Sequence, residues 1–71
     1  MTKAQTLAKQ LRDESTRTDG IVHHDYSLSL ERALRKSAKQ MIWNGDVVEF
    51  WGGTDRNPWR VHLDLPKQTR R

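Results

Sequence analysis

The sequence predicts a small α+β domain in which two helices precede a C-terminal antiparallel β-hairpin. Apolar residues recur at helical spacing over residues 2–17 and again after Ser27, whereas after Gly45 apolar and polar residues alternate as in a half-buried strand. Of the 71 residues, 34% are hydrophobic and 31% are charged, so the chain can build only one thin core. We therefore assign residues 1–65 to a single domain and residues 66–71 to a basic C-terminal tail.

Residues 2–17 are expected to form the first helix, and residues 21–27 a short strand. The helix contains no proline or glycine, and Gly20 follows it as a stop signal. The apolar side of this helix consists of Ala4, Leu7, Ala8 and Leu11. Residues 21–27 are rich in β-branched and aromatic side chains, which favour an extended chain.

The second helix is the clearest element of the sequence. Ser27 or Ser29 can cap its N-terminus, and Asn44-Gly45 supplies a stop directly after Trp43. Its predicted apolar side consists of Leu30, Leu34, Ala38 and Met41. The opposite side carries Arg32, Arg35, Lys36 and Lys39, with Glu31 off to the side. The sequence therefore predicts an amphipathic helix with a basic outer face.

Two strands, residues 46–51 and 59–65, are predicted on either side of a loop at residues 52–58. The loop contains glycine, aspartate, asparagine and proline, which are typical turn residues. In the second strand Trp59 begins an apolar row that continues with Val61, Leu63 and Leu65. A large aromatic ring at the head of such a row predicts that Trp59 packs in the core.

The same alternation predicts the register of the hairpin. The apolar row of the first strand, which contains Phe50, has even numbers and that of the second strand has odd numbers. If the two apolar rows face the same side, Phe50 pairs with Val61 or with Trp59. Either register sets Glu49 opposite an arginine or histidine of the second strand, which is a favourable outer-face pair. Trp51 then lies on the same face as Glu49, away from the core.

The predicted order of elements, helix, short strand, helix and hairpin, is similar to that of winged-helix DNA-binding domains. The resemblance covers most of the chain and rests on architecture, not on a sequence motif. Two features depart from it. A winged helix has one more helix before the hairpin, and its hairpin is usually basic, whereas residues 46–65 carry a net charge of −2.

No pattern in the sequence indicates catalysis, a cofactor or a metal ion. His23 and His24 point to opposite faces of a strand and cannot easily hold one ion together, and His62 could join one of them only if the first and last strands pair. The glycines at residues 52–53 are not followed by a predicted helix, so they do not indicate a phosphate-binding loop. Without cysteine, a signal peptide or a long apolar run, we expect a non-enzymatic cytoplasmic protein that does not enter a membrane.

Charge placement favours a nucleic-acid partner. The chain has a net charge of +4, and residues 66–71 alone contribute +3. We expect a small DNA-binding regulatory protein, active in transcription regulation as a homodimer, that contacts duplex DNA with the basic helix face and the tail. The predicted contact residues are Arg32, Arg35, Lys36, Lys39, Gln40, Arg56, Lys67, Arg70 and Arg71.

The alternative is a protein-binding module, such as an inhibitor or adaptor for an acidic protein. Its predicted surface consists of Trp43, Trp51 and Arg60, because tryptophan and arginine dominate the binding energy of protein interfaces. The acidic hairpin favours this alternative, and the basic helix and tail favour nucleic acid. For Trp43 and Trp51, packing and partner-binding roles both remain open.

Overall fold

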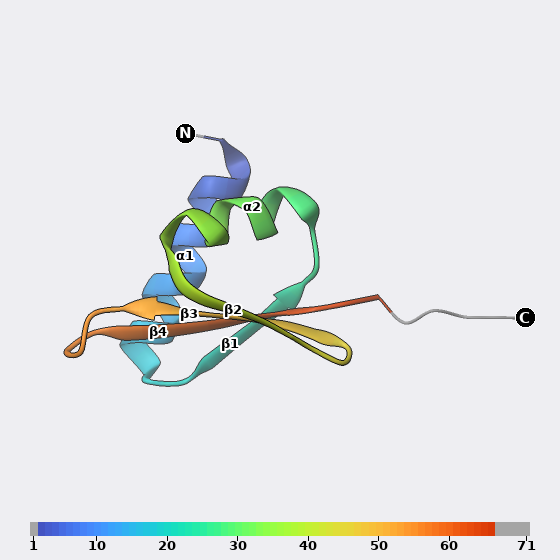
Figure 1. Ribbon diagram of the computed structural model, residues 1–71. Coiled ribbons are helices and arrows are strands. Elements are labelled where there is room, and N and C mark those ends of the chain that lie inside the picture. Colours follow the sequence, from blue (N-terminus) through green and yellow to red (C-terminus); the bar gives the residue numbers. More distant parts are fainter. Residues whose placement is uncertain (1, 67–71) are drawn as a thin grey trace, which may run out of the picture.

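Four strands form one mixed sheet, and both helices pack on the same face of it (Figure 1). The computed structural model describes residues 2–66. The elements are α1 (Lys3–Thr18), β1 (Ile21–Asp25), α2 (Leu28–Ser37), β2 (Ala38–Asn44), β3 (Val47–Gly53) and β4 (Pro58–Asp64). The strand order is β1-β4-β3-β2, with β1 parallel to β4 and the other neighbours antiparallel. The predicted α+β class is confirmed.

Helix α1 has the expected extent and is closed at both ends by local hydrogen bonds. Thr2 and Gln5 form a capping box, in which each backbone N–H donates to the other side chain at 3.1 Å. At the C-terminus Asp19, and not Gly20, adopts the left-handed conformation, with φ 52°. The side chain of the buried Ser15 accepts a hydrogen bond from the Arg60 N–H and donates one to the Gly20 carbonyl, both at 2.7 Å. Ser15 therefore ties the end of α1 to β4.

The prediction for the second helix is wrong at its C-terminus. Ser27 is the N-cap, as predicted, but α2 ends at Ser37 and residues 38–44 form strand β2. Asn44-Gly45 does not stop a helix. Gly45 (φ 63°) begins a two-residue hairpin loop, because Asn44 pairs directly with Val47. The helical spacing of Ala38 and Met41 does not decide the structure of this segment, because β3 offers residues 38–44 a pairing partner.

This extra strand turns the predicted two-stranded hairpin into part of a four-stranded sheet. A winged helix has a further helix before the hairpin, and here that part of the chain is extended. The resemblance in element order to winged-helix domains is therefore not confirmed. The strand predicted at residues 21–27 is present as Ile21–Asp25.

The predicted register of the hairpin is confirmed. Phe50 pairs with Val61, and Glu49 pairs with His62. Trp59 is only 6% exposed, whereas Trp51 is half-buried on the opposite face of the sheet. The buried core consists of Ala8, Leu11, Leu30, Leu34, Val48, Phe50, Trp59, Val61 and Leu63.

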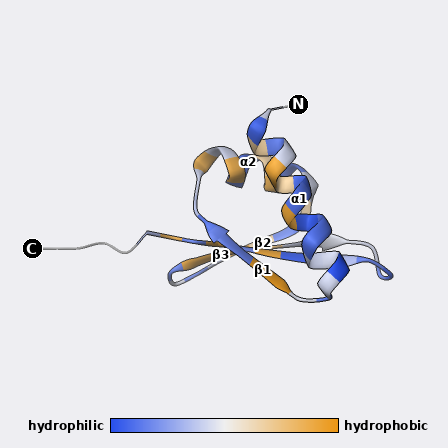
Figure 2. Ribbon diagram, turned by 180° about the vertical axis from the view of Figure 1, so that it is seen from behind, coloured by the Kyte–Doolittle hydropathy of each residue, from blue (hydrophilic) through white to orange (hydrophobic). Residues whose placement is uncertain are grey.

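The sheet is covered on one side only, as the view from behind also shows (Figure 2). Side chains facing the helices are buried in β3 and β4, and those on the other side are half-buried. Alternation therefore assigns each side chain of β2 to a face. Met41 and Trp43 lie on the helix side, opposite Phe50 and Val48, and Gln40 lies on the uncovered side, opposite Trp51.

Replacing the two hairpin tryptophans should affect stability very differently. The replacement Trp59→Ala removes a buried ring and should lower the free energy of unfolding by about 3–5 kcal/mol. This is about the total stability of a domain of this size, so most of the variant protein should be unfolded. Trp51→Ala removes a half-buried ring from the uncovered face and should cost about 1 kcal/mol. Urea denaturation of both variants measures the difference, and equal losses would contradict the assignment of faces.

Candidate nucleic-acid interface

The outer side of α2 carries three exposed cations, Arg32, Arg35 and Lys36. They face outward because Leu30 and Leu34, on the opposite side of the helix, are at most 1% exposed in the core. Lys39, the fourth predicted cation, is also exposed but lies in β2, just beyond the helix. We call these four residues the basic surface.

Most cations of the basic surface have no partner of opposite charge. Within residues 2–66, no carboxylate oxygen lies within 4.0 Å of the charged nitrogens of Arg32, Lys36 or Lys39. Arg35 lies 3.7 Å from Glu31. Two exposed cations of α1 differ, because Lys9 pairs with Asp13 at 2.9 Å and Arg17 pairs with Glu14. Among residues 2–66, three of the four cations of the basic surface are therefore left without a carboxylate partner.

Glu31, which was expected off to the side of the basic face, is buried and only 6% exposed, although its carboxylate lies 3.7 Å from Arg35. The Tyr26 hydroxyl donates a hydrogen bond to its carboxylate at 2.5 Å, and this bond raises the pKa of Tyr26. Tyr26 directly precedes the N-cap Ser27, so the turn into α2 brings its hydroxyl to Glu31, five residues further along the chain. As a result, the one carboxylate of α2 faces away from the solvent side of the helix.

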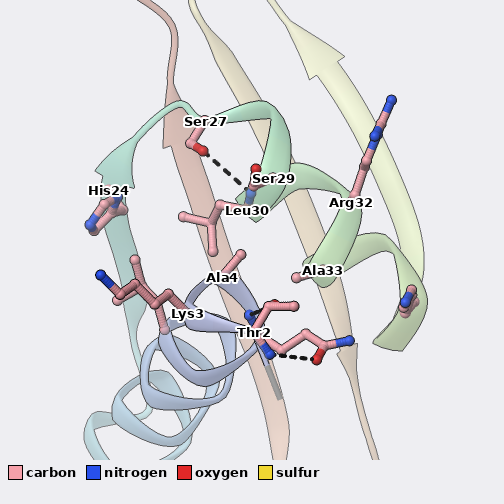
Figure 3. A pocket seen from close by; sticks show the side chains of 12 residues that line it. Thr2, Lys3, Ala4, His24, Ser27, Ser29, Leu30, Arg32 and Ala33 are labelled. Carbon is pink, nitrogen blue, oxygen red and sulfur yellow. Dashed lines mark hydrogen bonds between the residues drawn. The ribbon is translucent and has the colours of Figure 1, made fainter.

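A groove of about 570 Å³ runs beside α2 and extends the basic surface toward α1 (Figure 3). Its floor is apolar, with Ala4, Leu30 and Ala33 pointing into it. Lys3 and Arg32 stand on opposite sides of this floor. Lys3, like Arg32, has no carboxylate within 4.0 Å among residues 2–66. The sequence analysis did not include Lys3 because nothing in the local pattern places the start of α1 beside α2.

A second hollow, of about 360 Å³, lies where β2 begins and the β3–β4 loop turns. We call it the Trp51 hollow. It is lined by Lys39, Gln40, Trp51, Gly52, Gly53, Thr54, Asp55 and Pro58. The hollow brings together residues of the two predicted sites: Lys39 and Gln40 from the nucleic-acid site, and Trp51 from the protein-binding alternative.

The remaining predicted contact residues are more scattered. Arg56 is exposed in the loop between β3 and β4, next to Asp55 of the hollow. Lys67, Arg70 and Arg71 lie outside the described residues.

The predicted protein-binding residues do not share one surface. The guanidinium of Arg60 lies over the Trp51 ring, 5.8 Å from its centroid. Trp43 was expected at the end of the second helix near its basic face. It lies in β2 on the helix side of the sheet, is 54% exposed, and has its ring centroid 6.5 Å from that of Tyr26. The sheet therefore separates Trp43 from Trp51.

The uncovered face of the sheet brings His23 and His62 together, because β1 pairs with β4. Their ring centroids are 5.1 Å apart, and His23 Nδ1 lies 3.1 Å from Asp64 Oδ1. Within residues 2–66, no group of three or more histidine, aspartate or glutamate side chains is arranged to hold a metal ion. This pair therefore does not form a metal centre of the kind that needs three such ligands.

No known protein family model matches the chain, and no curated protein or solved structure is significantly similar to it. Among the described residues, neither helix combines the length and hydropathy that a membrane span requires.

The environment of His62 predicts a loss of stability on acidification. Burial lowers the pKa of His62, and the Glu49 carboxylate opposes this shift only in part. Its Nε2 atom is buried without a hydrogen-bond partner among the described residues, so a proton there would have no acceptor. The unfolded chain thus binds this proton more readily, and stability falls as the pH drops through the unfolded pKa of about 6.5.

His62→Gln should therefore lose less free energy of unfolding than the parent protein between about pH 7.5 and about pH 5.5. Urea denaturation at the two pH values measures this loss. An identical loss in the variant and the parent would show that His62 does not contribute.

Proposed function

We propose that the protein binds nucleic acid through the basic surface, with phosphate groups lying along α2 and the start of β2. The observation that carries the proposal is the set of exposed cations without carboxylate partners, Arg32, Lys36 and Lys39, reinforced by Lys3 across the groove. Like charges at three- and four-residue spacing destabilise a helix by a few tenths of a kcal/mol per pair. A polyanion relieves this repulsion and releases its own condensed counterions.

The structure also bears on how bases would be read. Gln40, one of the predicted contact residues, was expected on the second helix, but it lies in β2 on the uncovered side of the sheet. Helix α2 presents mainly arginine and lysine to solvent, and these side chains supply affinity for phosphate without strong sequence preference. We therefore propose binding of phosphate groups by the basic surface as the main part of the function. A role in transcription regulation on duplex DNA, as a cytoplasmic homodimer, is one specific form of this proposal, and binding of single strands is another.

Protein binding is the second candidate function, and one observation favours it. Trp51 and Arg60 are in contact on a sheet face that no helix covers, and both residue types are common interface anchors. Trp43 lies on the other face, so the predicted three-residue surface is reduced to two residues. Glu49 and Asp64 on the same uncovered face would favour a partner with basic side chains there.

Binding to a single- or double-stranded oligonucleotide should weaken steeply with salt. About four phosphate contacts predict a slope of about −3.6 for a duplex and about −2.8 for a single strand when the logarithm of the binding constant is plotted against that of salt concentration. Fluorescence anisotropy of a labelled oligonucleotide across a salt series measures the slope. A flat dependence, or no binding at low salt, would contradict the proposal.

The double variant Arg32→Gln, Lys36→Gln should bind more weakly and give a shallower salt slope, because it removes two unpaired cations of the basic surface. The double variant Lys9→Gln, Arg17→Gln is the matched control. It removes the same formal charge from α1, where both cations already pair with carboxylates. Equal weakening in the two variants would show that net charge matters and the basic surface does not.

A further inference from the structure

We propose that the ligand is a single-stranded nucleic acid and that the Trp51 hollow receives one of its unpaired bases. This inference rests on the function proposed above and adds to it the class of nucleic acid and a site for base contact. The hollow has a volume of about 360 Å³, within the range of about 300–1,000 Å³ that is usual for small-ligand sites.

The Trp51 ring is held in place before any ligand arrives. Its indole N–H donates to one Glu49 carboxylate oxygen at 3.3 Å, and the Asn44 side chain donates to the other oxygen at 3.1 Å. These two bonds lower the pKa of Glu49, so its carboxylate stays charged and keeps accepting them. Arg60 lies over the ring at 5.8 Å and His62 lies beside it at 6.3 Å. A fixed aromatic ring at the wall of a hollow is suited to stacking, because little conformational freedom is lost on binding.

A β-bulge places polar groups of β2 next to this ring. Ala38 pairs with Gly52 and Gln40 pairs with Trp51, so Lys39 is an extra residue without a partner in β3. The Gln40 side chain is exposed and lines the hollow on the same face of the sheet as Trp51. Its amide can both donate to and accept from the edge of a base. Lys39 adds a positive charge at the same rim.

Two arguments favour a nucleic acid over a peptide as the occupant. The cation Lys39 belongs to both the Trp51 hollow and the basic surface, and it is separated from Lys36 by only two residues. Phosphates that lie along α2 would therefore lead a chain directly to the hollow. Asp55 is the single carboxylate among the lining residues, and it would repel a phosphate but accept a hydrogen bond from an N–H group of a base, such as the imide N–H of thymine.

The hollow also selects single strands over duplexes. Bases of a duplex are paired and stacked on each other, so neither face is free to contact an indole ring. A single strand can turn one base out and stack it on Trp51 while neighbouring phosphates remain on Lys36 and Lys39.

The experiment compares three fluorescein-labelled probes of equal length, about 12 nucleotides, which is a typical single-strand site. The first is oligodeoxythymidine, the second is the same backbone without bases, and the third is a duplex. At one low salt concentration, the parent protein should bind oligodeoxythymidine about tenfold or more tightly than the baseless backbone, because one stacked base contributes this much. The duplex should bind with an affinity near that of the baseless probe.

Protein variants then test whether the preference for the probe with bases depends on the Trp51 hollow. Trp51→Ala should abolish the preference for the probe with bases and leave binding of the baseless probe unchanged, and Trp51→Phe should keep most of it. Trp43→Ala is the matched control, since it also removes a half-exposed indole but from the other face of the sheet. Circular dichroism confirms that each variant is folded, and the probe comparison with the parent protein tests the proposal even if Trp51→Ala does not fold.

Each alternative result has a distinct meaning. Equal affinity of the parent protein for the three probes, with a steep salt dependence, would overturn base binding at the hollow and leave the proposed function standing. Tighter binding of the duplex would do the same and would favour groove contacts. Loss of the preference in Trp43→Ala as well as Trp51→Ala would overturn the assignment to this hollow. Absence of binding to all three probes at low salt would overturn both proposals.

Discussion

The contact between the Trp59 ring and the backbone of Gly52 determines how the end of the sheet is built. A methyl group at Gly52 would lie 2.4 Å from Trp59 Cζ2, so only glycine allows the ring to pack this closely. The Arg12 guanidinium lies over the same ring, 5.8 Å from its centroid, and connects it to α1. With Trp59 fixed on the helix side, the alternation of β3 directs Trp51 to the uncovered side, where it forms a wall of the hollow.

The local sequence was sufficient to predict which face a side chain occupies wherever a single periodicity, helical or alternating, dominated. Residues 59–63 alternate cleanly, so the face of Trp59 followed from sequence alone, and the pairing of Phe50 with Val61 is one of the two registers that the sequence allowed. The basic side of α2 followed in the same way, because Arg32, Arg35 and Lys36 lie within the part of the chain that is helical.

Residues 38–44 show why the rest could not be predicted. Ala38 and Met41 continue the helical spacing, and Asn44-Gly45 serves equally as a helix stop or a hairpin turn. Pairing with β3 decides between the two, and this is a long-range interaction. The Trp51 hollow depends on that strand, because Lys39 and Gln40 meet Trp51 only when β2 pairs with β3. The burial of Glu31 beside Tyr26 has a different origin, since it is a local contact over five residues that the helical projection of α2 does not include.

The two sides of the molecule differ in charge, and the hollow lies where they meet. Among residues 2–66, the basic-surface cations without a carboxylate partner occupy the helix side, whereas Glu49 and Asp64 lie on the uncovered face of the sheet. Lys39 and Gln40 mark the boundary, which is why a chain bound along α2 would reach Trp51 and not the far end of the sheet. The central claim is that one continuous surface, from α2 to the hollow, contacts a nucleic acid.

Amide chemical-shift mapping by NMR, with oligodeoxythymidine added to the isotope-labelled protein, tests this claim most directly. The account predicts that the largest shifts fall in residues 32–40 and 51–57, together with the indole N–H of Trp51. Shifts confined to β1 and the Trp43 end of β2, or no shifts at low salt, would contradict it.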